Sequence, residues 1–62
     1  MKNWKIVYTI VTGTIFSNEF NTLDELLAWL EQRAEQLRPI TKVLTAWELY
    51  DGEYKQRYSW RA

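Results

Sequence analysis

Hydrophobic and polar positions divide the chain into four strand-like stretches and one helical stretch. The strand-like stretches are dense in β-branched and aromatic residues, or alternate large and polar residues, and both patterns suit a pleated strand. They cover residues 4–12, 15–20, 41–50 and 53–60. The helical stretch covers residues 23–37, where leucines recur at three- and four-residue spacing. The pattern therefore predicts the order strand, strand, helix, strand, strand.

Local signals mark both ends of the predicted helix. Thr22 and Glu25 match a capping box, in which the Thr22 hydroxyl accepts a hydrogen bond from the third helical N–H group and the Glu25 side chain reaches back. Pro39 ends the helix because it biases Arg38 out of the helical region. The apolar stripe consists of Leu23, Leu26, Leu27, Leu30, Ala34 and Leu37. Trp29 lies at its edge, about 110° from the centre at 100° per residue, so we expect Trp29 to be only partly covered.

These elements predict an α+β fold in a single domain of residues 1–62. A helix laid across one face of a four-stranded antiparallel sheet is the simplest arrangement that buries the apolar stripe. Two hairpins and two short links around the helix keep every connection within the usual loop lengths. The order of the strands and the face that the helix covers stay open.

Asp51-Gly52 fixes the register of the second hairpin. Both residues favour the positive φ that a two-residue type I′ turn needs, and this turn places Glu48 opposite Lys55 as an opposite-charge pair. One face then collects Val43, Thr45, Trp47, Leu49, Tyr54, Gln56, Tyr58 and Trp60, and we expect it to be the core face. The other face collects Lys42, Leu44, Ala46, Glu48, Tyr50, Glu53, Lys55, Arg57, Ser59 and Arg61, and we expect it to be solvated.

The turn of the first hairpin is less determined. A two-residue loop at Thr12-Gly13 or at Gly13-Thr14 gives the same parity, because Gly13 is free to take positive φ. One face then holds Val7, Thr9, Val11, Phe16, Asn18 and Phe20, and the other holds Trp4, Ile6, Tyr8, Ile10, Ile15, Ser17 and Glu19. A three-residue loop would swap the partners, but it favours glycine at its last position, where we expect Thr14.

Composition limits what the chain can bind. Eight Lys and Arg balance eight Asp and Glu, so no overall field favours nucleic acid or an anionic membrane. The sequence has neither Cys nor His, so it lacks disulfides and the usual zinc ligands. No apolar run approaches membrane-spanning length, and we find no signal peptide. We expect a cytoplasmic protein without cofactor, metal or membrane contact.

Two surfaces are candidates for partner binding. Residues 4–12 carry large apolar side chains on both faces, and one helix can cover only one of these faces. The apolar side chains on the other face would then suit a protein or homo-oligomer interface. The alternative is that Trp side chains and the terminal residues cover that face. The polar side of the helix is acidic, which suits a basic partner but is also typical of a solvated helix face. The candidate partner-binding residues are Trp4, Tyr8, Trp29, Tyr50, Asp24, Glu31 and Glu35.

Nucleic-acid binding and catalysis have less support. Aromatic and basic residues interleave in the second hairpin, as in surfaces that bind single strands, and the binding residues on its outer face would be Tyr50, Lys55, Arg57 and Arg61. The expected register, however, places Lys55, Arg57 and Arg61 on the face opposite to Tyr54, Tyr58 and Trp60, so the two halves of such a site do not converge. For catalysis, the sequence offers no His, no Cys and no glycine-rich phosphate loop.

The whole ββαββ pattern, with TLDELLAWL as the helix and WELYDGEY as the hairpin, resembles small accessory proteins encoded by bacteriophages and prophages. Many such proteins act without chemistry, and the resemblance implies a chain that binds a host protein and blocks or retargets it. We therefore expect a non-enzymatic protein-binding module of the inhibitor or adaptor type. A single-stranded nucleic-acid-binding sheet and a structural homo-oligomer are the alternatives.

Overall fold

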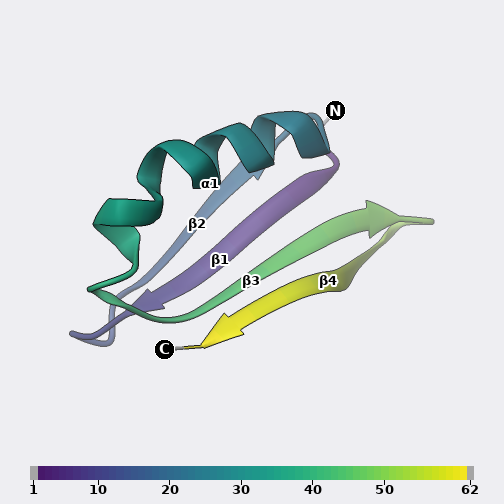
Figure 1. Cartoon of the computed structure of the whole chain (residues 1–62). Helices are drawn as coiled ribbons and strands as arrows, with labels where there is room; N and C mark the ends of the chain where they lie inside the picture. The colour runs from purple at the N-terminus through teal and green to yellow at the C-terminus, as the bar shows by residue number, and fades with distance from the viewer. Residues whose placement is uncertain (1, 62) are drawn as a thin grey trace.

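The computed structural model describes residues 2–61, which form one four-stranded antiparallel sheet and one α-helix (Figure 1). In chain order the elements are β1 (Trp4–Ile10), β2 (Ile15–Phe20), α1 (Leu23–Leu37), β3 (Thr41–Tyr50) and β4 (Glu53–Arg61). The strand order in the sheet is β2-β1-β3-β4, so β1 and β3 are central and β2 and β4 are the edges. The predicted α+β fold of ββαββ order is confirmed.

Helix α1 begins and ends where the sequence signals predict. The backbone N–H of Glu25 donates to Thr22 Oγ1 at 3.2 Å, and the Glu25 carboxylate accepts from the N–H of Asn21 at 3.3 Å. The side chain of Thr22 thus satisfies one of the N–H groups that the first turn leaves free. At the other end the N–H of Arg38 still donates to Ala34 O at 3.0 Å, and Arg38 keeps helical angles with φ of −53° and ψ of −48°. The helix ends at the expected residue, but the prediction that Pro39 moves Arg38 out of the helical region is wrong.

The β1–β2 turn differs from the predicted two-residue loop. The N–H of Ile10 donates to Thr14 O at 3.0 Å and the N–H of Gly13 to Ile10 O at 2.9 Å, so the loop has three residues and ends at Gly13. Gly13 has φ of 93°, which suits glycine at the last loop position. The three-residue alternative thus holds, one residue earlier than expected. Strand β1 accordingly ends at Ile10, and Tyr8 pairs with Phe16 and shares a face with it.

The β3–β4 hairpin follows the predicted turn but not the predicted faces. Asp51 and Gly52 have φ of 52° and 79°, as a type I′ turn requires, and Glu48 lies opposite Lys55. Beyond that pair the register shifts by one residue: Gln56 pairs with Trp47, but the next pair is Tyr58 with Ala46. Arg57 is the extra residue of this β-bulge, which turns the following side chains of β4 to the other face of the sheet.

The bulge and the three-residue loop together set the two faces of the sheet. The helix-side face holds Phe16, Asn18 and Phe20 of β2, Trp4, Ile6 and Tyr8 of β1, Leu44, Ala46 and Glu48 of β3, and Arg57, Tyr58 and Trp60 of β4. The open face holds Ile15, Ser17, Glu19, Lys5, Val7, Thr9, Val43, Thr45, Trp47, Leu49, Tyr54, Gln56, Ser59 and Arg61.

The core lies between α1 and the helix-side face. Its fully buried apolar side chains are Ile6, Leu26, Leu44 and Ala46. The side of β3 that carries Leu44 and Ala46 is the one we expected to be solvated, so this prediction is wrong. The pairing with β1 explains the outcome, since Ala46 lies opposite Ile6 and Leu44 opposite Tyr8 on the face that the helix covers.

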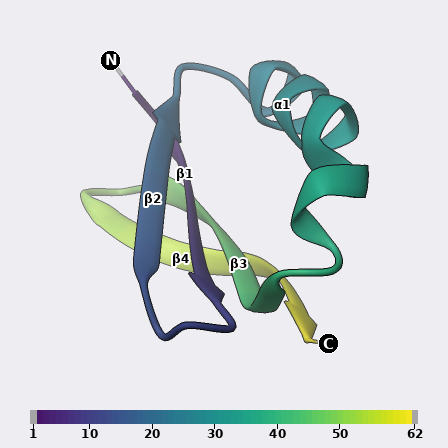
Figure 2. The same cartoon turned by 90° about the vertical axis from the view of Figure 1, so that its left-hand side faces the viewer.

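Helix α1 covers only part of this face. It packs chiefly against β1 and β2, and Figure 2 shows that β4 crosses at a steep angle to β2 on the far side of the sheet. Neighbouring strands rotate by about 20–25° each, so a helix that follows β1 and β2 diverges from β4. The β4 part of the helix-side face is therefore left beside the helix, whereas Leu44 and Ala46 of β3 are buried in the core.

Candidate functional site

A groove runs between α1 and β4 along the part of the helix-side face that the helix does not cover. It consists of two adjoining hollows of about 250 and about 420 Å³, which share Leu30 on the helix and Tyr58 on β4. Its lining is Trp4, Leu23, Leu26, Leu27, Leu30, Glu31, Ala34, Leu37, Arg38, Thr41, Leu44, Ala46, Arg57, Tyr58 and Trp60. We call this surface the α1–β4 groove.

Large apolar side chains on both walls of the α1–β4 groove are exposed to solvent. The exposed fraction is 41% for Leu23, 50% for Leu27 and 52% for Tyr58. On the other side of the helix, Trp29 packs against Phe20 and Tyr8, with ring centroids 5.8 and 5.9 Å apart. The apolar stripe of α1 is thus wider than the part of the helix that packs on the sheet. The edge of the stripe that carries Leu27 faces the groove.

The smaller hollow contains an unsatisfied polar group. Thr41 is only 2% exposed and lines this hollow, and its Oγ1 has no hydrogen-bond partner within residues 2–61. Leu37 and Trp60 line the same hollow, so the surroundings of the hydroxyl are largely apolar. Buried hydroxyls usually have a partner in the assembled state of a protein.

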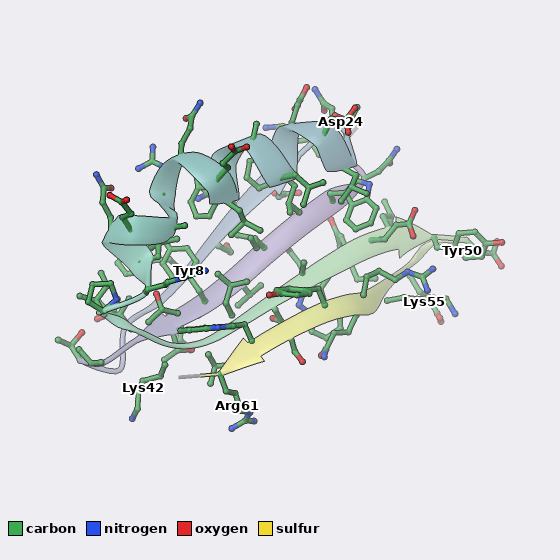
Figure 3. All side chains as sticks on the ribbon, in the orientation of Figure 1. Tyr8, Asp24, Lys42, Tyr50, Lys55 and Arg61 are labelled. Atoms are coloured by element: carbon green, nitrogen blue, oxygen red, sulfur yellow. The ribbon has the colours of Figure 1, made fainter. Side chains whose placement is uncertain are left out.

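The helix side of the groove carries three carboxylates and one cation, since Arg38 lines the smaller hollow together with Glu31. Glu31 lines the smaller hollow, and Asp24 and Glu35 lie on the same side of α1, because residues four and seven apart stack along one side of a helix. Figure 3 shows Asp24 on the outer side of the helix. On the opposite wall the charge of Arg57 is compensated, since its Nε lies 3.0 Å from Glu48 Oε1.

The open face differs from the apolar surface that we expected there. Lys5 Nζ lies 4.0 Å from the centroid of the Tyr54 ring, which is a cation–π contact. Trp47 Nε1 donates to Thr45 Oγ1 at 2.9 Å, and the Thr45 hydroxyl donates to Val7 O at 3.3 Å. These contacts cover the face with its own side chains. Exposed large apolar side chains within residues 2–61 include three that line the α1–β4 groove (Leu23, Leu27 and Tyr58), while Val11, Ile15, Phe16, Ile40 and Tyr50 lie outside it.

The predicted partner-binding residues do not gather at one site. Trp4 lines the groove and Glu31 its rim, whereas Tyr8 and Trp29 are partly buried against the core, as expected for Trp29. Tyr50 is exposed at the tip of the β3–β4 hairpin, at the far end of the molecule in Figure 3.

Sequence reasoning missed the residues that open the groove, namely Leu23, Leu27, Thr41 and Tyr58. A usable signal was the width of the apolar stripe. Leu27 and Trp29 lie about 160° apart around the helix, and this arc is wider than the side of a helix that packs on one sheet.

The bulge also changes the distribution of cations and aromatic rings. It leaves Tyr54 and Arg61 on the open face together with Lys5, while Lys55 and Arg57 belong to the helix side. The prediction that the rings of β4 and its cations lie on opposite faces is therefore wrong on both faces, because Tyr54 shares the open face with Arg61, and Tyr58 and Trp60 share the helix side with Lys55 and Arg57. Figure 3 shows Arg61 and Lys42 pointing away from the helix.

Residues 2–61 contain neither a metal-binding cluster nor a membrane-spanning helix. Within residues 2–61 no cluster of three or more Asp, Glu, His or Cys side chains could hold a metal ion. In the same range no helix has the length and apolar character needed to cross a membrane. No family model, curated protein or solved structure matches this chain.

Proposed function

We propose that this chain is a non-enzymatic protein-binding module, and that the α1–β4 groove is its binding surface. An inhibitor or adaptor of a host protein, as the resemblance to phage accessory proteins implies, would act through such a surface. The observation that carries the proposal is the exposure of Leu23, Leu27 and Tyr58 on the two walls of one groove. Clustered apolar exposure of this kind is typical of interfaces, and aromatic side chains such as Tyr58 often dominate their energies.

Affinity capture with two matched variants tests the proposal. Leu27→Gln adds a polar group in the groove, and Ile15→Gln makes the same change at a side chain that is 67% exposed on the open face. We expect a partner from the native host to be retained by the wild type and by Ile15→Gln, and lost from Leu27→Gln. Reconstitution with the purified partner then gives the stoichiometry. Equal retention by both variants would rule out the groove as the binding surface.

A second function, binding of single-stranded nucleic acid, is favoured by one observation on the open face. Lys5, Tyr54 and Arg61 share that face, and its only acid within the strands is Glu19. A filter-binding titration with an oligonucleotide across salt concentrations tests it. Affinity that falls steeply with salt and is reduced in Arg61→Gln supports this function. Absence of binding at low salt removes it.

A further inference from the structure

We propose that the occupant of the α1–β4 groove is an amphipathic α-helix of a different protein, with a basic flank beside its apolar stripe. This inference rests on the proposed function and names the chemistry of the partner. The helix would lie beside α1, over β4, as a second helix on this face of the sheet.

The dimensions of the sheet leave room for one more helix. Strands lie about 4.8 Å apart, so four strands span roughly 14 Å between the axes of the edge strands, and a helix with its side chains is about 10–12 Å wide. One helix therefore covers about two strands, and α1 already packs on β1 and β2. The uncovered part is the β4 side of the groove, where Tyr58 is 52% exposed, because Leu44 and Ala46 of β3 are already buried in the core. The small side chain of Ala34 on the helix wall permits the close approach, about 8–10 Å between axes, that packed helices need.

Backbone hydrogen bonding favours a helix over an extended segment. The inner backbone groups of β3 and β4 pair with neighbouring strands, and the free backbone groups of β4 lie along its outer edge in the plane of the sheet, so the floor of the groove offers an incoming segment few backbone partners. A strand lying in this apolar groove would bury N–H and C=O groups without partners, and this is costly. A helix brings its own backbone hydrogen bonds and presents only side chains.

The charge of the groove rim selects a basic partner and argues against a second copy of this chain. Asp24 and Glu31 lie about two turns apart along the helix rim, Glu35 lies about one turn further, and Arg38 follows at the end of the helix. In a twofold dimer the α1 helices would lie side by side and bring these acidic rows together, which is unfavourable. Lysines or arginines on the flank of a different helix would instead meet carboxylates.

Synthetic peptides of about 18 residues test this inference, each with leucines at helical spacing. The first carries lysine beside the leucine stripe, the second carries glutamate at the same positions, and the third is the lysine peptide with a central proline. Binding is followed by isothermal titration and by circular dichroism. We expect the lysine peptide to gain helicity and to bind at least about tenfold more tightly than the other two. We also expect Leu27→Gln to weaken its binding about tenfold and Ile15→Gln to leave it unchanged.

Several outcomes overturn the inference. Equal affinity for the lysine and glutamate peptides removes the charge selection, and equal affinity for the proline peptide indicates an extended occupant. No saturable binding of the lysine peptide up to about 1 mM removes the helix. A concentration-dependent dimer in sedimentation that Leu27→Gln abolishes would assign the groove to a second copy. Capture of a host partner that depends on Leu27, without peptide binding, would leave the proposed function intact and reject only the helical occupant.

Discussion

Two threonines of β3 differ in what their hydroxyl groups contact. Thr41 Oγ1 is buried without a partner in the described chain, whereas Thr45 Oγ1 accepts from Trp47 Nε1 at 2.9 Å and donates to Val7 O at 3.3 Å. We predict that Thr41→Val raises the free energy of unfolding by about 1 kcal/mol, because valine keeps the shape and removes an unsatisfied polar atom. Urea unfolding followed by tryptophan fluorescence measures the change.

Thr45→Val is the matched control for that prediction. It deletes two hydrogen bonds on the open face and leaves the Trp47 indole N–H without its acceptor, so we expect the free energy of unfolding to fall by about 1 kcal/mol. A loss of stability in Thr41→Val would mean that its hydroxyl is paired in solution, and the polar contribution that we assign to the groove would be withdrawn.

Gly13 shows how far sequence alone determines a turn. Its presence predicted a turn, but glycine suits several loops, and the choice among them depended on which carbonyl pairs with the N–H of Ile10. We predict that Gly13→Ala lowers the free energy of unfolding by about 1–2 kcal/mol. Its φ is 93° and no heavy atom lies within 4 Å of an added Cβ, so the cost is conformational rather than steric. Thermal unfolding measures it, and Thr12→Ala in the same loop serves as a control that we expect to change little.

At the scale of elements, the helix was the most predictable part of the chain. Its cap and its proline act on neighbouring residues, so the bounds Leu23–Leu37 followed from local chemistry. We predict that Thr22→Ala lowers the free energy of unfolding by about 1 kcal/mol because the N–H of Glu25 loses its acceptor. Thermal unfolding and far-UV circular dichroism test this, with Thr22→Ser as the variant that retains the acceptor. Equal losses in both variants would contradict a capping role.

The β-bulge was the least predictable element. Periodicity describes an uninterrupted strand, and nothing in the residues around Arg57 shows that it has no partner on β3. One unpaired residue is enough to reverse every side chain that follows, so Tyr58 and Trp60 join Leu44 and Ala46 instead of Thr45 and Trp47. The predicted separation of rings from cations depended on that register and failed with it.

At the scale of the whole molecule, the site depends on how one helix and four twisted strands fit together. Sequence predicted the helix, its apolar stripe and the acidic side with Asp24, Glu31 and Glu35. It did not predict that α1 would pack chiefly over β1 and β2 and leave β4 beside it. That outcome follows from the pairing order and the twist, which are properties of the assembled sheet. The groove is therefore visible only in three dimensions.

The same geometry predicts that two adjacent leucines of α1 contribute very differently to stability. Leu26 is 1% exposed in the core, and Leu26→Ala should lower the free energy of unfolding by about 2–5 kcal/mol. Leu27 is half exposed in the groove, and Leu27→Gln should change it by less than about 1 kcal/mol, because glutamine has a similar helix propensity. Urea unfolding of both variants decides this.

A small effect of Leu27→Gln on unfolding has a direct consequence for function. The solvent-exposed side chain of Leu27 would then contribute little to the stability of the free protein. Its role would be to bind a partner in an interface that buries it. Loss of partner or peptide binding in this variant could then be attributed to the groove and not to unfolding. A large destabilisation would instead show that Leu27 belongs to the core of the free protein, and the groove would lose the feature on which its proposed function rests.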